Sequence, residues 1–172
     1  MNFLTEQDVL GSNKRYYIEG DRWSYFSHVI DLIKKYNMTS DPTKVLEIGP
    51  FKLTMVPGCD VLDILPDYNP KYVRDANDLP WPIADKQYDL VIGLQVFEHL
   101  LKHKYIFQEI ERISKHCILS FPYKWREYKN HHGGIDESVI KYWTCNYTPV
   151  EQFVTTSKKK VNRIISYFRF GE

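Results

Sequence analysis

The chain has 172 residues, of which 43% are hydrophobic and 26% are charged, an ordinary composition for a globular protein that is large enough to form its own core. The formal net charge of +1 argues against an overall electrostatic field that would favour nucleic acid or an anionic membrane surface. No apolar run approaches the roughly 18 residues of a membrane span, and acidic residues stand where a signal peptide would be basic, so we expect a cytoplasmic protein. Three widely spaced cysteines, Cys59, Cys117 and Cys145, favour free thiols over a disulfide framework or a metal site.

The N-terminal part of the chain predicts one amphipathic helix. Residues 1–20 are polar and show only weak periodicity. From Trp23 to about Tyr36, apolar residues recur at steps of three and four, which is typical of a helix with one buried face. Asp21 is a suitable N-cap for this helix, and residues 37–43 form a loop.

Residues 45–49, with the sequence VLEIG, predict a short buried strand that stops at a glycine. Glu47 is unusual there, because a buried carboxylate is costly unless it is paired or takes part in chemistry. Gly49 allows a sharp turn and a close approach of the backbone to a ligand, since it has no Cβ atom. The alternative is a strand at the edge of the sheet with a solvated Glu47.

The middle of the chain predicts further strands, several of which end at an acidic residue. Residues 50–58 contain two prolines and cannot hold a long regular helix. The predicted strands are residues 59–64 with Asp63 near the end, residues 72–74 running into Asp75, residues 88–94, and residues 117–121. Residues 95 to about 115 predict a helix with one apolar face.

The C-terminal part predicts a loop, two helices and a last strand. Residues 123–134 are a long polar and aromatic loop, and residues 136–143 form a short helix. Residues 148–153 resemble the start of another helix, and residues 161–170 form a final strand that could run antiparallel. Strands separated by helices or long crossings predict an α/β protein with a mostly parallel central sheet and helices on both faces.

Ligands of such sheets bind at the carboxyl ends of the strands, so one crevice should collect Gly49, Asp63, Asp75 and Gln95. Asp63 is placed to accept hydrogen bonds from two ribose hydroxyls, and Asp75 from the exocyclic amine of adenine. We expect Leu79, Trp81 and Ile83 to wall the ring. The alternatives are that Asp63 only caps a loop and that Asp75 belongs to an ordinary turn.

Five pieces of the chain, in this order and spacing, resemble the S-adenosylmethionine-dependent methyltransferases of the Rossmann-like class. They are VLEIG at residues 45–49, DVLD at 60–63, DANDLPWP at 75–82, YDLVI at 88–92 and VFEHL at 96–100. The resemblance covers about residues 44–123. It implies a Rossmann-like three-layer sandwich and S-adenosylmethionine as the cofactor.

The resemblance also implies a set of cofactor-binding residues. In the family, residues at these positions shape the pocket for the methionine part of the cofactor, hold its ribose, contact its adenine and lie beside its sulfonium. In that order they are here Glu47 and Gly49, then Asp63 with Ile64, then Asp75 with Ala76, and finally Gln95.

One position departs from the family pattern. The family usually continues from the first glycine as Gly-x-Gly and opens a helix, but here Phe51 stands at the second glycine position. Either a loop replaces that helix, with Tyr16, Tyr17 or Trp23 folding over the cofactor, or the site is degenerate. An NAD site is less favoured, because the Gly-x-Gly-x-x-Gly fingerprint is absent.

His99 is the first candidate for a general base, because an imidazole titrates near neutral pH, and Glu98 ranks below it. The alternative is that Glu98 and His99 only stabilise the start of the helix. His131 and His132 are second candidates, and we expect no metal there, because adjacent histidines point apart. Tyr123, Trp125 and Tyr128 of the same loop could offer flat surfaces to a ring-shaped acceptor, or could simply pack on the sheet edge.

The sequence therefore predicts a single methyltransferase-like domain over residues 1–172, with an N-terminal helical segment (1–40), a cofactor-binding core (44–123) and an acceptor-side C-terminal part (124–172). The predicted function is methyl transfer from S-adenosylmethionine to a small molecule such as a sugar or a biosynthetic metabolite. The alternative is an inactive domain that serves as an interaction or scaffold subunit. We expect a small-molecule substrate, no nucleic acid and no membrane partner. A homodimer is a further possibility.

Overall fold

The computed structural model describes residues 1–12, 21–126 and 132–171. Its centre is a seven-stranded sheet with the strand order β3-β2-β1-β4-β5-β7-β6. Neighbours from β3 to β5 are parallel, whereas β7 runs antiparallel to both β5 and β6. The strands are β1 (Val45–Ile48), β2 (Asp60–Asp63), β3 (Tyr72–Val73), β4 (Tyr88–Leu94), β5 (Ser114–Pro122), β6 (Glu151–Thr156) and β7 (Asn162–Arg169).

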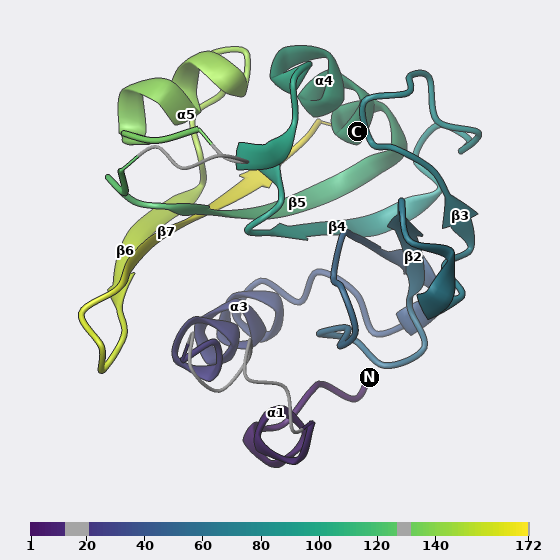
Figure 1. The fold of residues 1–172 in the computed structure, drawn as a ribbon. Helices are drawn as coiled ribbons and strands as arrows, with labels where there is room; N and C mark the ends of the chain where they lie inside the picture. Colours follow the sequence, from purple (N-terminus) through teal and green to yellow (C-terminus); the bar gives the residue numbers. More distant parts are fainter. Residues whose placement is uncertain (13–20, 127–131, 172) are drawn as a thin grey trace.

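Helices cover both faces of the sheet, which confirms the predicted three-layer α/β architecture (Figure 1). The helices α1 (Glu6–Gly11) and α3 (Trp23–Lys35) lie on one face, and α4 (His103–Ile113) and α5 (Glu137–Trp143) lie on the other. Strand β1 separates two cores, because alternate side chains of a strand point to opposite faces. Leu46 and Ile48 pack on the α4 side, and Val45 packs on the α3 side.

The N-terminal helices differ from the prediction at two points. The helix α3 buries Phe26, Val29 and Ile33 as expected, but Asp21 is not its N-cap. Asp21 has a φ of 45°, and its carboxylate accepts a hydrogen bond from the backbone N–H of Lys158 at 2.9 Å. The helix α1, which the prediction missed, starts at a capping box in which the side chains of Thr5 and Asp8 satisfy each other's backbone N–H groups.

Two predicted helices in the second half are wrong in part or entirely. The segment after Gln95 forms only a short 3-10 turn, η3 (Phe97–His99), before α4 begins at His103, because the backbone is extended at Leu100. The helix then ends at Ile113, and β5 starts three residues earlier than predicted. Residues 151–156 form a strand, because β6 pairs with β7 along its whole length.

The connections from β1 to β2, from β2 to β3 and from β3 to β4 contain no α-helix within the described residues. Short 3-10 turns, η1 (Pro42–Lys44) and η2 (Pro66–Tyr68), precede β1 and β3, and residues 49–59 form a loop, as the two prolines predicted. No helix in the described part of the chain is long and apolar enough to cross a membrane. At the carboxyl end of β1 the chain therefore continues as a loop, residues 49–59, and not as a helix.

Candidate functional site

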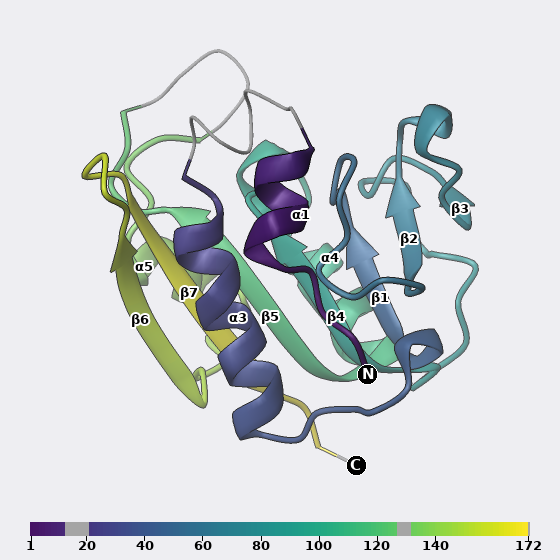
Figure 2. The same ribbon diagram turned by 90° about the horizontal axis from the view of Figure 1, so that it is seen from below.

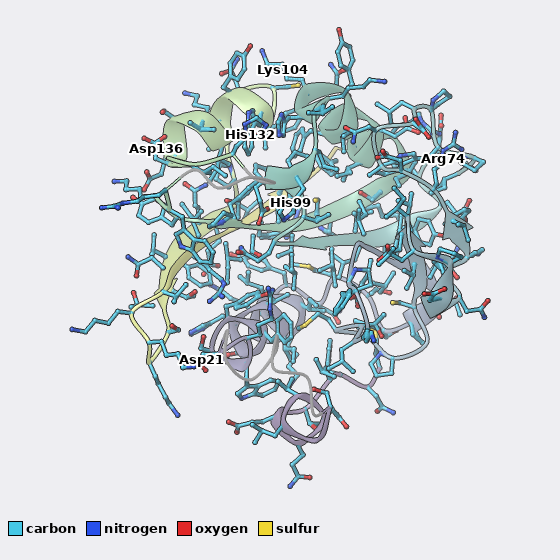
Figure 3. The ribbon with its side chains drawn as sticks, in the orientation of Figure 1. Asp21, Arg74, His99, Lys104, His132 and Asp136 are labelled. Carbon is cyan, nitrogen blue, oxygen red and sulfur yellow. The ribbon has the colours of Figure 1, made fainter. Side chains whose placement is uncertain are left out.

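A cavity of about 410 Å³ lies at the carboxyl ends of β1, β2, β3 and β4. Figure 2 shows that the long parallel strands point to this same edge of the sheet. Figure 3 labels His99, which lines the cavity from η3, and Arg74, which lines it from the end of β3. Seven of the eight predicted site residues line it, namely Gly49, Asp63, Ile64, Asp75, Ala76, Gln95 and His99.

The remaining wall contains residues to which the sequence interpretation gave no role in binding the cofactor. They are Ile48, Phe51, Leu62, Leu65, Arg74, Asn77, Val96 and Leu100. Each of them lies within a few residues of a predicted strand end. Proximity to a strand end is therefore the sequence feature that could have identified them as lining residues. The cavity is thus an apolar cleft with a small number of polar groups, which is typical of sites for small molecules and cofactors.

Gly49 makes the turn at the end of β1. Its φ is +58°, a left-handed conformation that side chains rarely adopt. Its N–H donates to the carbonyl of Leu62 at 2.9 Å, so the turn is tied to β2. A Cβ atom at this position would lie 2.8 Å from Cγ2 of Val96. The glycine is therefore required by the close approach of the β4–η3 loop, whatever the ligand requires.

Asp63 is buried at the end of β2, with 7% of its surface exposed. Its Oδ1 accepts a hydrogen bond from the backbone N–H of Leu65 at 2.9 Å, so the loop-capping role is real. Within the described residues this bond uses Oδ1 alone, which leaves Oδ2 for a ligand. The two roles that the sequence suggested for Asp63 are compatible.

Asp75 likewise stabilises a turn. Its Oδ1 accepts from the backbone N–H of Asn77 at 2.8 Å and from the Asn77 side-chain amide at 2.9 Å. Asn77 in turn accepts from the backbone N–H of Leu101 at 2.8 Å. The turn therefore connects the end of β3 to the segment before α4, and its residues Asp75, Ala76 and Asn77 form one wall of the cavity.

The expectation that Trp81 and Ile83 wall a ligand ring is wrong. Both are buried in the core on the α4 side, with 2% and 5% of their surface exposed, and Leu79 packs against the same core. The backbone N–H of Trp81 donates to Oε1 of Glu109 at 2.7 Å, and its indole N–H donates to the carbonyl of Ala76 at 3.2 Å. This part of the motif thus supports the cavity wall from behind.

Glu47 lies in a central strand with 2% of its surface exposed, so the alternative of a solvated edge residue is wrong. Its carboxylate accepts hydrogen bonds from the backbone N–H groups of Met55 at 2.9 Å and Val56 at 2.8 Å. Burial raises the pKa of Glu47 to about 7, and these two hydrogen bonds oppose that rise. The Glu47 side chain therefore anchors the loop over residues 49–59.

Glu47 does not line the main cavity but a small second one on the α3 side of the sheet, together with Arg22 and Tyr25. Gly49 and Ile48 line both cavities, so the two are neighbours around the end of β1. Phe51, at the position of the missing second glycine, has a φ of 66° and lines the main cavity. A phenylalanine thus occupies a backbone conformation that glycine adopts without strain.

The side chains of Glu98 and His99 have different surroundings. His99 lines the main cavity, whereas Glu98 does not and has 4% of its surface exposed. Burial raises the pKa of Glu98 to about 8, and its own backbone N–H and the positive charges of Arg22 and Arg163 oppose that rise.

Two described residues that follow β5 are tied to other elements by hydrogen bonds. The indole N–H of Trp125 donates to the carbonyl of Asn162 at 2.7 Å, and the backbone N–H of His132 donates to the carbonyl of Glu98 at 3.0 Å. The His132 ring contacts the ring of Trp143, with centroids 5.6 Å apart.

Not every aromatic residue expected near the site is there. Trp23 lines a groove between the N-terminus and α3 and does not fold over the main cavity. Tyr16, Tyr17, Tyr128 and His131, which were also candidates, lie outside the described residues.

No family model matches the chain, and no curated protein matches it. Solved structures do. The chain is similar to the N-methyltransferase NodS from Bradyrhizobium japonicum WM9 in complex with S-adenosyl-L-homocysteine, with 18% identity over 74% of this chain and 78% of that one and a TM-score of 0.56. It is similar to the N-terminal domain of EvdMO1 in the presence of S-adenosyl-L-homocysteine and D-fucose, with 15% identity over 80% of each chain and a TM-score of 0.52.

A third similar structure is a chain from the complex of the Haloferax volcanii Trm112 methyltransferase activator with its candidate methyltransferase. Its identity is 12% over 88% of this chain and 96% of that one, and the TM-score is 0.59. Identities this low establish the fold alone. The chain has the Rossmann-like fold that S-adenosylmethionine-dependent methyltransferases share.

Proposed function

We propose that the protein binds S-adenosylmethionine in the main cavity and transfers its methyl group to a small-molecule acceptor. The observation that carries the proposal is that Gly49, Asp63, Asp75 and Gln95, four residues from the ends of four different strands, line one cavity of about 410 Å³. Brought together at the carboxyl edge of a parallel sheet, they match what an adenosine cofactor requires. The two similar proteins crystallised with S-adenosyl-L-homocysteine support the same ligand.

The residues present fit the parts of this cofactor. Oδ2 of Asp63 would accept hydrogen bonds from the ribose hydroxyls, while Oδ1 keeps its bond to Leu65. Asp75 and Ala76 would contact the adenine, and Ile64 and Leu65 would cover it. The methionine end would extend past Gly49 toward the second cavity, where the guanidinium of Arg22 can face its carboxylate. Glu47 would act indirectly, by holding the loop that shapes this end.

Bound S-adenosylmethionine supplies a methyl group on a positively charged sulfur, which is displaced in line by a nucleophile. The chain has to orient the acceptor, exclude water and accept a proton from it. Gln95 would lie beside the reacting centre. Two bonds to Ser120 hold it at the end of β4: its backbone N–H donates to the Ser120 carbonyl at 3.1 Å, and its side-chain amide donates to the Ser120 hydroxyl at 3.2 Å. The acceptor would approach from the side of β5 and β7. A sugar acceptor is compatible with the D-fucose present with EvdMO1.

A second candidate function is a methyltransferase-like subunit that does not bind the cofactor and acts through a partner chain. Phe51 at the second glycine position favours it, because its side chain occupies part of the cavity wall. The similarity to a chain of an activator complex makes a protein partner worth testing.

Titration calorimetry with S-adenosylmethionine, S-adenosyl-L-homocysteine and NAD separates the two candidates. The enzyme predicts micromolar binding of the first two ligands, no binding of NAD, and loss of binding in Asp63→Ala. Binding would justify a screen of acceptors with methyl-labelled cofactor. Well-folded protein that gives no heat at high micromolar ligand would contradict the enzyme and favour the scaffold function.

A further inference from the structure

Glu98 has a carboxyl oxygen that nothing in the described part of the chain satisfies. Its Oε2 atom is buried and has no hydrogen-bond partner among the described residues. Buried polar atoms in native proteins are nearly always bonded, so an exception calls for an explanation such as a ligand or a role in chemistry. Glu98 does not line the main cavity itself, but the next residue in the chain, His99, does.

Glu98 has positively charged neighbours from both ends of the chain. The positive charges that act on its carboxyl come from Arg22, just before α3, and from Arg163, in β7. The guanidinium of Arg163 lies over the ring of Tyr25 at 4.7 Å and over the ring of Trp125 at 5.5 Å. Figure 2 shows the start of α3, the turn between β6 and β7 and the end of β5 at the same edge of the sheet as the cavity.

We propose that Glu98, and not His99, is the catalytic residue that faces the methyl acceptor and takes its proton. The inference rests on the proposed function. In the step, the lone pair of an acceptor N–H or O–H group forms the bond to the methyl carbon. The carbon–sulfur bond breaks, its electron pair stays on sulfur as the neutral thioether, and the acceptor proton passes to Oε2 of Glu98.

The charges around Glu98 also limit the class of acceptor. Arg22 and Arg163 place positive charge near the carboxyl, which disfavours an ammonium ion and favours a hydroxyl or a neutral amine. Since burial raises the pKa of Glu98 to about 8, the carboxyl can both release and accept a proton near neutral pH, which suits a general base. His99, in this arrangement, contacts the cofactor.

The test compares Glu98 in two complexes of the full chain. S-adenosylmethionine and S-adenosyl-L-homocysteine differ by the methyl group and the positive charge on sulfur. Carboxyl carbon NMR of protein labelled in its glutamates, with Glu98→Gln to assign the signal, gives the pKa of Glu98 in each complex. If Glu98 faces the reacting centre, its pKa should be lower in the S-adenosylmethionine complex by about one pH unit or more. Glu109, a buried glutamate on α4 bonded to Trp81, serves as the control and its signal should be the same in both complexes.

The outcomes are distinct. A Glu98 pKa that is equal in the two complexes would overturn the inference. Glu98→Gln should bind S-adenosylmethionine within about twofold of the natural protein, since Glu98 lies outside the cavity, and a tenfold loss would assign Glu98 to the cofactor site instead. With an acceptor from the screen, Glu98→Gln should slow transfer by about 100-fold or more, and an unchanged rate would refute the base. If the natural protein binds neither ligand, the proposed function itself fails, and the inference fails with it.

Discussion

A Cβ atom on Gly49 would lie 2.8 Å from Cγ2 of Val96, which joins the end of β1 to the residue that follows Gln95. The glycine of the VLEIG stretch is thus required by packing within the chain. Both Gly49 and Val96 line the cavity, so a ligand bound against this turn would contact both residues.

We predict that Gly49→Ala destabilises the protein by about 2–4 kcal/mol. The left-handed backbone alone costs a residue with a side chain about 1–2 kcal/mol, and the displacement of Val96 adds a packing cost. Urea unfolding of the variant measures the loss. Gly58→Ala is the matched control, since Gly58 also has a positive φ (+85°) but no atom within 4 Å of its Cβ position. Equal losses in the two variants would show that the contact with Val96 carries no energy.

Asp63 offers a test that separates its two roles. In Asp63→Asn the amide oxygen can still accept from Leu65, but the amide nitrogen cannot accept from a ribose hydroxyl. We therefore expect the melting temperature to stay close to that of the natural protein, while the affinity for S-adenosylmethionine falls by about 1–3 kcal/mol. Calorimetry and thermal unfolding measure the two effects. Asp63→Ala should lose both, and an Asp63→Asn variant with full affinity would exclude Asp63 from the ribose site.

The strand ends were predictable from sequence because each combines a β-branched or apolar run with an acidic residue or glycine. Gly49, Asp63 and Asp75 follow this rule, and the parallel topology then brings them together. The position of Trp81 was not predictable, because the sequence does not show which side of an extended segment faces the core. The hydrogen bond from Trp81 to Glu109 spans 28 residues, and only the folded chain reveals it.

The errors in secondary structure have the same origin. Residues 148–153, with Thr148, Pro149 and Glu151, resemble a helix start, but pairing with β7 decides for a strand. The helix α1 was missed because its six residues carry little periodicity, although the Thr5–Asp8 capping box was readable. Aspartate is a residue type typical of N-caps, but the carboxylate of Asp21 accepts from the backbone N–H of Lys158, far away in sequence.

The buried carboxyl of Glu47 should make the stability depend on pH. Burial raises its pKa from 4.5 to about 7 in the folded state, so the folded chain binds the proton more tightly than the unfolded chain does. The contribution of Glu47 to the free energy of unfolding therefore falls as the pH rises from about 4.5 through 7, by up to about 3 kcal/mol. Urea unfolding at pH 5 and pH 8 measures the difference.

Glu47→Gln should remove this part of the pH dependence and should cost about 1–3 kcal/mol. Met55 and Val56 donate to different oxygens of the carboxylate, and in the amide one of these positions becomes a nitrogen that cannot accept. Glu6→Gln, an exposed glutamate in α1, is the control and should leave the pH dependence unchanged. If Glu47→Gln showed the same fall between pH 5 and pH 8 as the natural protein, the pH dependence would have to come from another group.

Arg112 makes two ion pairs of different burial, and these allow a matched comparison behind the cavity wall. Its guanidinium bonds to Glu109 at 2.6 Å and to Asp85 at 2.6 Å, but the side chain of Glu109 is 10% exposed and that of Asp85 is 77% exposed. Removing Glu109 leaves the N–H of Trp81 and part of the guanidinium without an acceptor, so Glu109→Ala should cost about 3–5 kcal/mol. Asp85→Ala should cost less than about 1 kcal/mol, since water can replace an exposed partner.

The same pair of variants tests whether this cluster supports the site. The indole of Trp81 holds the carbonyl of Ala76, which lines the cavity, so a displaced Trp81 should shift the turn that carries Asp75. We expect Glu109→Ala, assayed at a temperature where it is still folded, to bind S-adenosylmethionine more weakly by about tenfold, which corresponds to about 1.4 kcal/mol. Asp85→Ala should bind it normally. Full affinity in a destabilised Glu109→Ala would mean that the turn at Asp75 holds its shape through its own hydrogen bonds to Asn77, without support from α4.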